Sequence, residues 1–253
     1  MQRLAVVSDI HGNLPALEAV LADAARHAVD ATVNLGDIAS GPLWPRETVA
    51  LLQTLGLPTI AGNHERQVLA GDRSTMGASD AFAAARLDED QRAWLRALPA
   101  TLRLDDVHLC HGTPDDDLTM WLESLDAAAP GGVRAATATE VHARRRPALT
   151  AGATLVLCGH SHVARVIALG AATVVVNPGS VGLPAWQDDG PPAIGVETGS
   201  PHARYAIVER GPAGWDIALR AVAYDWHAAA RRAEAGGRPE WAHALATGRN
   251  PIG

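Results

Sequence analysis

Histidine and aspartate side chains recur at the ends of apolar runs in this sequence. Five of the eleven histidines fall at these few positions. A single polar turn after one strand is common, but buried charges and imidazoles gathered in this way need partners. The pattern therefore favours a metal site over five separate turns. The runs end in Asp9-Ile10-His11, Gly36-Asp37, Gly62-Asn63-His64, His111-Gly112 and Gly159-His160-Ser161-His162.

These strand ends should come together in the folded chain. In an open α/β sheet, residues that bind ligands gather beyond the carboxyl ends of the strands. A glycine adjoins the polar residues after each run, which lets the backbone turn sharply and approach a neighbouring loop closely. We therefore expect the five strand ends to meet at one rim.

The types of these side chains indicate which ions would bind. Carboxylates, one amide oxygen and several imidazoles suit manganese, iron, zinc or nickel, whereas calcium prefers a set made mostly of oxygen. Seven ligands are too many for one tetrahedral ion, but they suffice for two ions if Asp37 bridges them. Paired divalent ions activate a shared hydroxide and hold both ends of an in-line displacement at phosphorus. The seven predicted ligands are Asp9, His11, Asp37, Asn63, His111, His160 and His162.

Apolar periodicity and turn residues predict the elements that position these side chains. Strands are expected over residues 4–8, 31–36 and 57–62, and helices over 14–27, 45–55 and 64–98. Further strand-like runs, separated by glycine or proline, occupy 101–104, 107–110, 153–158, 164–169, 172–176, 203–208 and 215–220. Two more helices are expected over 225–235 and 239–247. This order, βαβαβ followed mostly by strands, predicts two sheets packed face to face with helices outside.

Length and composition limit the class of protein. A chain of 253 residues with 47% hydrophobic residues suits one large α/β domain, and no repeat or linker divides it, so we expect a single domain over 1–253. The net charge of −7 argues against broad nucleic-acid binding, which needs a basic face. No secretory or membrane-spanning segment is visible, and Cys110 and Cys158 lie inside apolar runs. We therefore expect a cytoplasmic protein with two buried thiols.

In these motifs the sequence resembles the calcineurin-like metallophosphoesterases. Their ordered motifs D-x-H, G-D, G-N-H, H-G and G-H-x-H correspond to residues 9–11, 36–37, 62–64, 111–112 and 159–162. The sequence is most similar to the compact single-domain enzymes of bacteria and archaea, which share SDIHGN and a GD-x(4)-GP loop, and NPGSVG at 177–182 extends the match. The resemblance implies a four-layer αββα sandwich of two mixed β-sheets flanked by helices, in agreement with the order of the predicted elements.

The resemblance also implies roles for individual residues. One metal would be held by Asp9, His11, Asp37 and His162, and the other by Asp37, Asn63, His111 and His160. His64 would be the proton donor rather than a ligand. The implied activity is that of a dinuclear metal-dependent phosphoesterase with two divalent transition-metal ions. Manganese is the expected metal, and iron, zinc or nickel are the alternatives. It would hydrolyse a small phosphodiester, phosphomonoester or nucleotide phosphate by attack of a metal-bridging hydroxide.

A second class of function is a non-catalytic member of the same fold that binds a protein partner. Such members generally have eroded ligands or lack the catalytic histidine. All seven predicted ligands and His64 are present here, which favours the enzyme. The expected partner is a small phosphate-ester or nucleotide substrate, and neither a membrane nor a nucleic acid is expected.

One part of the family pattern is missing. Serine/threonine phosphatases and related dinucleoside tetraphosphatases follow the G-D motif with an Asp-Arg pair, in which the aspartate orients the catalytic histidine and the arginine grips phosphate. The corresponding loop here, GDIASGPLWP (36–45), has neither residue. A phosphoprotein phosphatase is therefore disfavoured. The group that orients His64 stays open, since Glu65 is adjacent in the chain but need not be in contact.

Other segments border the predicted site. Residues of about 70–100 and 114–147 are candidate lids, and Trp121 is expected to pack in the core rather than stack on a substrate. The arginines in 143–147 are expected to end a helix rather than grip phosphate. The candidates for substrate binding, or for backing the site, are Asn13, Thr113, Ser161, Asn177 and Ser180.

Overall fold

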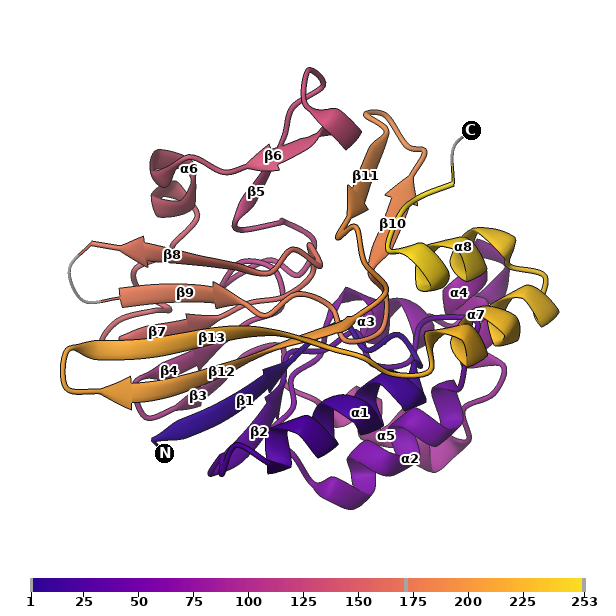
Figure 1. Ribbon diagram of the computed structural model, residues 1–253, viewed down its shortest axis with the longest axis horizontal. Helices are drawn as coiled ribbons and strands as arrows, with labels where there is room; N and C mark the ends of the chain where they lie inside the picture. The colour runs from indigo at the N-terminus through magenta and orange to yellow at the C-terminus, as the bar shows by residue number, and fades with distance from the viewer. Residues whose placement is uncertain (1, 171–172, 252–253) are drawn as a thin grey trace.

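Two β-sheets packed face to face form the centre of the computed structural model, which describes residues 2–170 and 173–251 (Figure 1). The first sheet has the order β13-β12-β1-β2 and consists of β1 (Arg3–Val7), β2 (Ala31–Asn34), β12 (Ala203–Gly211) and β13 (Gly214–Val222). The second has the order β3-β4-β7-β9-β8 and consists of β3 (Leu102–Leu104), β4 (Val107–Leu109), β7 (Leu155–Leu157), β8 (Arg165–Leu169) and β9 (Thr173–Asn177). Both sheets are mixed, because each contains parallel and antiparallel pairs.

Strand β1 shows how side chains are divided between the layers. Leu4 and Val6 point into the core between the two sheets, whereas Ala5 and Val7 belong to the core on the helical side. All four are fully buried. Successive strand residues face opposite sides of a sheet, so a central strand covered on both faces requires a continuous apolar run.

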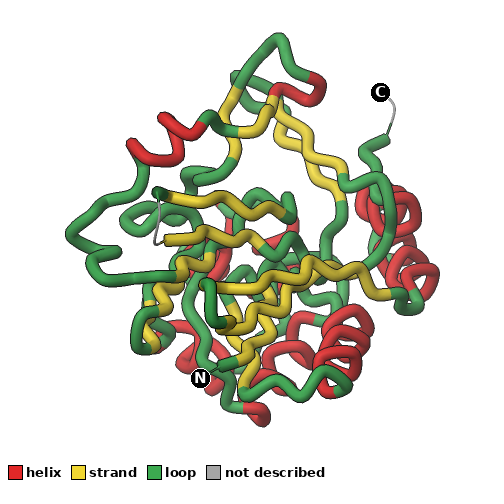
Figure 2. The backbone as a smooth tube through the Cα atoms, turned by 60° about the vertical axis from the view of Figure 1, so that its left-hand side comes forward, coloured by secondary structure: helices red, strands yellow, loops and turns green. Residues whose placement is uncertain are grey.

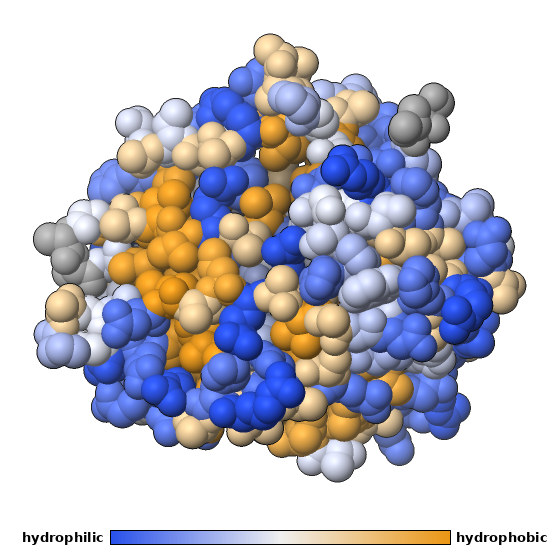
Figure 3. Space-filling view, viewed as in Figure 1, coloured by the Kyte–Doolittle hydropathy of each residue, from blue (hydrophilic) through white to orange (hydrophobic). Residues whose placement is uncertain are grey.

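One edge of the sandwich is open. Val166 of the edge strand β8 lies opposite Val176, and Leu219 of the edge strand β13 lies opposite Ala206. Val176 and Ala206 belong to the core between the sheets. Val166 and Leu219 are 38% and 43% exposed, and Figure 3 shows apolar side chains gathered over this part of the molecule. The core between the sheets therefore reaches the surface here.

Helices cover the outer face of the first sheet (Figures 1 and 2). Helix α1 begins after Asn13, whose side chain accepts a hydrogen bond from the backbone N–H of Ala16, and it buries Leu17 and Val20. All the helices of this layer contribute side chains to one apolar cluster. They are α1 (Leu14–Ala25), α2 (Pro45–Leu55), α3 (Asn63–Val68), α4 (Ala78–Ala84) and α5 (Glu89–Ala97). Among the described residues, no helix is long and apolar enough to cross a membrane.

A mostly irregular segment covers the outer face of the second sheet. Its regular elements are β5 (Glu123–Leu125), η2 (Pro130–Gly132), β6 (Val133–Ala135) and α6 (Ala138–Ala143). Trp121 is 1% exposed, and its indole N–H donates to the carbonyl of Val141 at 2.9 Å, which confirms that it packs in the core. Cys110 and Cys158 lie in the same cluster as free, buried thiols, as predicted. The predicted αββα arrangement of two mixed sheets flanked by helices is confirmed, with α6 and a hairpin in the fourth layer.

The remaining elements stand at one end of the molecule, beside α4 in Figure 1. Strands β10 (Ala185–Asp188) and β11 (Ile194–Glu197) form a hairpin, and helices α7 (Trp226–Ala235) and α8 (Pro239–Thr247) pack against each other. The side chain of Asn250 donates to the carbonyls of Trp186 and Val196 at 3.1 and 3.3 Å. These bonds tie the residues after α8 to the hairpin.

The structure corrects some predicted elements. The strand predicted over 57–62 is reduced to a single β-bridge between Thr59 and Asn34. Pro58 lacks a backbone N–H and so cannot donate a hydrogen bond that would extend the pairing. The predicted helix over 64–98 consists of α3, α4 and α5 with the short turn η1 (Arg73–Thr75), since Gly71 and Gly77 disfavour a continuous helix. The hairpins β5–β6 and β10–β11 were not predicted, because strands of three or four residues show too little periodicity.

Candidate metal centre

Six of the predicted ligands form two compact groups beyond the carboxyl ends of the strands. In each group, one ligand atom from every residue lies within 4.8 Å of the others. The residues come from the ends of β1, β2, β4 and β7, so strand direction alone brings them to one rim. The first group is Asp9, His11 and His162, and the second is Asp37, His111 and His160.

Short distances join the two groups into one cluster. The Nε2 atom of His111 lies 3.1 Å from Asp37 Oδ2 and 4.0 Å from Asp9 Oδ1. Asn63, the seventh predicted ligand, places Oδ1 3.2 Å from the same Nε2 atom. His162 Nε2 lies 3.4 Å from Asp9 Oδ1. All seven side chains therefore lie in one continuous arrangement.

Backbone carbonyls determine which nitrogen faces the centre. The Nδ1 atoms of His11, His111 and His162 each lie 2.8 Å from a carbonyl oxygen, those of Ser40, Leu35 and Leu183 respectively. A carbonyl can only accept, so each Nδ1 carries the proton and each Nε2 can present a lone pair to the centre. Metal-ligating histidines are held in this way. Together with the carboxylate and amide oxygens, these histidines fit a divalent transition metal.

The neighbourhood shifts the pKa values of these side chains in both directions. Burial and the adjacent His162 lower the pKa of His11 to about 3, and burial and His111 lower that of His160 to about 4. Burial opposes protonation of His111 as well, but the carboxylate of Asp37 outweighs it and raises the pKa of His111 to about 10. His11 and His160 are therefore neutral and ready to ligate. A cation that binds His111 and Asp37 displaces a proton.

Backbone strain is concentrated at the same residues. Eight described residues other than glycine have positive φ, and five of them are predicted ligands. Such a conformation is uncommon for side chains other than asparagine, aspartate and histidine, and it is found at functional sites whose surroundings hold it in place. The five are Asp9 (φ 54°), His11 (52°), Asp37 (54°), His160 (68°) and His162 (63°).

The ligand loops approach each other so closely that two positions require glycine. A Cβ atom on Gly62 would lie 2.2 Å from Asp37 Oδ1, and one on Gly159 would lie 2.0 Å from Ser8 Oγ. Neither position has room for a side chain, so the ligand loops can pack against each other only with glycine there.

His64 has a partner that the sequence did not reveal. Its Nδ1 atom lies 2.7 Å from Oδ1 of Asp80, a carboxylate that is 6% exposed in the first turn of α4. Burial would lower the pKa of His64, but the carboxylates of Asp37 and Asp80 raise it to about 9. Asp80 thus occupies the place that the missing Asp-Arg motif left open. No spacing signal links it to His64, because a separate helix carries it.

Glu65 holds the ligand loops together instead of orienting His64. Its carboxylate accepts hydrogen bonds from the backbone N–H groups of Asp37, Ile38 and Gly62, each at 2.8 Å. Glu65 is 1% exposed and is the third residue of α3. The pattern Gly62-x-x-Glu65 is a helix-start signal in which a glutamate reaches back to the preceding backbone, so the sequence did contain this information.

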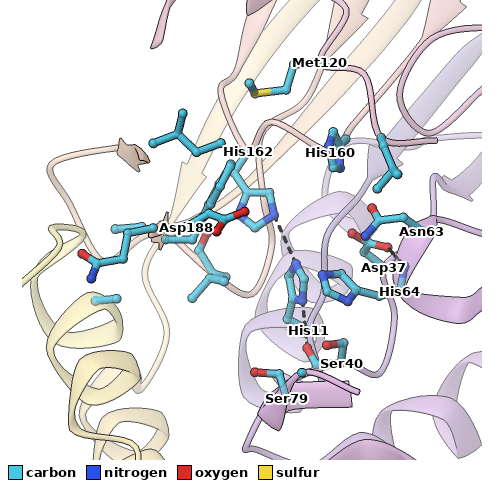
Figure 4. Close-up of a pocket in the computed structure, with 18 of the residues that line it drawn as sticks. His11, Asp37, Ser40, Asn63, His64, Ser79, Met120, His160, His162 and Asp188 are labelled. Atoms are coloured by element: carbon cyan, nitrogen blue, oxygen red, sulfur yellow. Dashed lines mark hydrogen bonds between the residues drawn. The ribbon is translucent and has the colours of Figure 1, made fainter. Parts of the chain in front are cut away.

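Five of the seven predicted ligands line a cavity of about 1060 Å³, namely His11, Asp37, Asn63, His160 and His162 (Figure 4). Figure 4 shows Asp37, Asn63 and His64 on one side of it and Asp188 on the other, with His162 between them. Both candidate lid segments contribute to its wall, the first through residues 77–80 and the second through residues 118–120, 123–125, 140 and 144. The sequence reasoning missed the contributions of β10 and α8.

Two aromatic side chains from those elements flank the ligands. The ring of Trp241 lies 6.1 Å from that of His11, and the ring of Trp186 lies 6.0 Å from that of His162. Arg144 lies at the end of α6, as predicted, but its guanidinium donates to the backbone carbonyls of residues 120, 121 and 123 in another segment rather than to the end of its own helix.

The five proposed substrate contacts lie beneath the site and are not among the described residues that line the cavity. Asn177 donates to the carbonyl of Gly159 at 2.7 Å, and Ser180 donates to the carbonyl of Asp9 at 2.7 Å. Asn13, Thr113 and Ser161 are likewise buried and hydrogen-bonded within the protein. Their geometry corresponds to the alternative of backing the site, because their polar groups are used to support the ligand loops.

Comparison with known proteins agrees with this geometry. Residues 2–198 match the family model described as the calcineurin-like phosphoesterase superfamily domain. A segment of 66 residues is 42% identical to the uncharacterized protein MJ0912 of Methanocaldococcus jannaschii, and this match spans 26% of the chain and 27% of that protein.

Solved structures resemble the whole chain. The metallophosphoesterase from Sphaerobacter thermophilus is 25% identical, with a TM-score of 0.73 over 98% of this chain and 99% of that one. The hypothetical protein PH1004 from Pyrococcus horikoshii OT3 is 21% identical, with a TM-score of 0.77 over 99% and 100% of the two chains. The family match covers most of the chain and includes the residues of the candidate metal centre, so the protein belongs to the calcineurin-like phosphoesterase superfamily.

Proposed function

We propose that this protein is a dinuclear metal-dependent phosphoesterase that hydrolyses a small phosphodiester, phosphomonoester or nucleotide phosphate. The observation that carries the proposal is the pair of ligand groups beside a histidine held by a carboxylate, with residues of both groups and the histidine lining one cavity. This combination supplies a place for cations, a place for a phosphate group and a proton donor.

The two groups support the proposed sets of metal ligands. Asp9, His11 and His162 would hold one ion with Asp37, while Asp37, Asn63, His111 and His160 would hold the other, so that Asp37 is shared. The donor set suits manganese, and also iron, zinc or nickel. When bound, such ions supply positive charge and Lewis acidity that polarise phosphate oxygens and lower the pKa of water.

His64 would act on the leaving group. With Nδ1 hydrogen-bonded to Asp80, its Nε2 atom remains available to the cavity. As an oxygen of water bonds to phosphorus, the bond between phosphorus and the leaving oxygen breaks, and the proton on Nε2 passes to that oxygen. The attacking water releases one proton to solvent, and His64 takes up a proton from solvent before the next turnover. Asp80 would fix the tautomer and orientation of the ring and stabilise its protonated form.

A hydrolysis screen on metal-free protein tests the proposal. Phosphomonoesters, phosphodiesters and cyclic phosphates would each be offered with manganese, nickel, zinc or magnesium. We expect hydrolysis that depends on added metal and that is abolished in Asp37→Ala. Lack of turnover on every substrate with every metal, in folded protein that binds metal, would contradict the proposed function.

A further inference from the structure

The cavity extends well beyond the predicted metal ligands. Its volume of about 1060 Å³ is far larger than a phosphate group needs, and a second cavity of about 810 Å³ adjoins it between the β5–β6 and β10–β11 hairpins. A substrate therefore has room for an organic group on the side of the phosphate away from His64 (Figure 4). The residues shared by the two cavities are Glu123, Gln187, Asp188, Asp189, Ile194 and Asn250.

The arginines that line the first cavity are already engaged, and the chain has no lysine. Arg238 forms an ion pair with Glu240 and donates to Ser79 Oγ at 3.2 Å. Arg144 donates to three backbone carbonyls and to Ser124 Oγ. Among the described residues that line the first cavity, no arginine is left free to bind a second phosphate group far from the metal ligands.

Three carboxylates line the region where the two cavities adjoin. Asp188 and Asp189 line both cavities, and neither forms an ion pair within the described part of the chain. Glu123 lines both as well, is 2% exposed, and binds Arg165 through Oε1 at 2.8 Å. Burial raises the pKa of this carboxyl, and it outweighs the opposite effects of the Ser161 hydroxyl and of Arg165. By geometry, Oε2 has no hydrogen-bond partner within 3.5 Å among the described residues. A buried carboxylate oxygen without a donor calls for one from a ligand.

Trp186 adds an aromatic surface beside these carboxylates. Because side chains alternate along a strand, Trp186 and Asp188 share one face of β10, and both line the first cavity. An aromatic ring next to carboxylates attracts an organic cation. A metal ion is not the expected occupant, since these carboxylates are absent from the described clusters whose ligand atoms lie within 4.8 Å of one another.

We propose that Glu123, Trp186, Asp188 and Asp189, here called the acidic wall, bind a positively charged amino group of the substrate. The inference rests on the proposed function and narrows its substrate class to phosphate esters of amino alcohols. Glu123 Oε2 accepts an N–H group, Trp186 contacts the cation, and the two aspartates supply further negative charge. Polyphosphates and nucleic acids are disfavoured, because they bring negative charge to the same wall.

Two diesters that differ only in this charge test the proposal. p-Nitrophenyl 2-aminoethyl phosphate and p-nitrophenyl propyl phosphate have the same leaving group and side chains of equal length. With manganese-loaded protein near neutral pH, we expect kcat/KM to be about tenfold higher for the aminoethyl ester, mainly through a lower KM, from a cation–π contact and charge-assisted hydrogen bonding at a partly exposed wall. The preference should decrease as salt is added.

Variants of the wall should change this ratio. Asp188→Asn and Trp186→Leu should each lower it. The double variant Asp188→Asn/Asp189→Asn should lower it further, to the preference that Glu123 and Trp186 still supply. Both aspartates are exposed, so replacing them should leave the protein folded. Glu123 is buried, and replacing it could unfold the protein. Asp216→Asn is the matched control, since Asp216 is an exposed carboxylate on β13 that does not line the cavity, and the ratio should stay at its wild-type value.

The outcomes separate this inference from the function on which it rests. Equal kcat/KM values for the two esters in the wild-type protein would overturn the acidic wall and leave the phosphoesterase intact. A ratio that the double variant leaves at its wild-type value would also overturn it. Failure to hydrolyse either ester, together with failure on every substrate of the hydrolysis screen with every metal, would overturn the proposed function itself.

Discussion

Replacing Asp80 with alanine should impair proton donation by His64 while the metals stay in place. Asp80 Oδ1 lies 2.7 Å from His64 Nδ1, and Asp80 is 6% exposed, so the bond is short and shielded from water. Without it the imidazole can rotate, exchange tautomers and lose the charge that favours its protonated form. Asp80 is not among the predicted ligands, so metal binding should persist.

The size of the effect depends on the leaving group. Proton donation by a positioned side chain is worth about 10²–10⁴-fold, and misplacing a group by about 1 Å costs up to about 10²-fold. We therefore expect Asp80→Ala to lower kcat about 100-fold on a benzyl ester, equivalent to about 2.7 kcal/mol of barrier. A nitrophenolate leaves without a proton, so the loss on the matching p-nitrophenyl ester should stay below about fivefold. His64→Ala should show the same contrast, and adding Asp80→Ala to it should cost little more.

The assay compares release of the alcohol from the two esters at saturating metal, with metal content measured in each variant. Asp90→Ala is the control, because Asp90 is exposed on α5 and does not line the cavity. Equal losses on both esters would refute the reasoning and assign His64 to phosphate binding. Loss of metal from Asp80→Ala would refute it too.

Three further predictions follow from other residues. Asp37→Ala should lose both metals and His162→Ala mainly one, and elemental analysis would contradict the shared role of Asp37 if its variant kept two metals per chain. Cys110→Ala and Cys158→Ala should each lower the free energy of unfolding by about 1 kcal/mol and keep the metals; loss of a metal would reveal a thiolate ligand. Burial raises the pKa of Asp23, but hydrogen bonds from arginine and tyrosine side chains outweigh this and lower it below the ordinary value. The stability that Asp23 contributes should be complete above about pH 5 and be lost as pH falls below about 4. In urea unfolding, the deficit of Asp23→Asn should therefore shrink from pH 7 to pH 3, and a constant deficit would disprove the assignment.

The ligand loops could be predicted from the sequence because strand direction determines where they lie. Asp9, Asp37 and His111 each follow an apolar run that ends at the same rim of the sandwich, and each loop contains a glycine. Local chemistry at each strand end therefore carried enough information to predict the cluster. The bounds of α2 were predicted for a similar reason, with proline at its start and a left-handed Gly56 at its end.

The rest of the cavity depends on packing that no local pattern records. Asp80 contacts His64 from helix α4. The orientation of α4 depends on the glycine-containing segment that precedes it. Trp186 comes from a four-residue strand, and Trp241 from a C-terminal helix whose position depends on contacts with α7 and β10. Periodicity predicts that such elements form, but not which distant surface they meet.

The most direct test of the central claim is a titration of manganese into metal-free protein, with bound metal and hydrolysis of bis(p-nitrophenyl) phosphate measured on the same samples. Two adjacent ligand groups, with Asp37 shared as proposed, predict that activity rises to its maximum as two ions bind per chain. Full activity with one ion bound, or with none, would contradict a dinuclear centre.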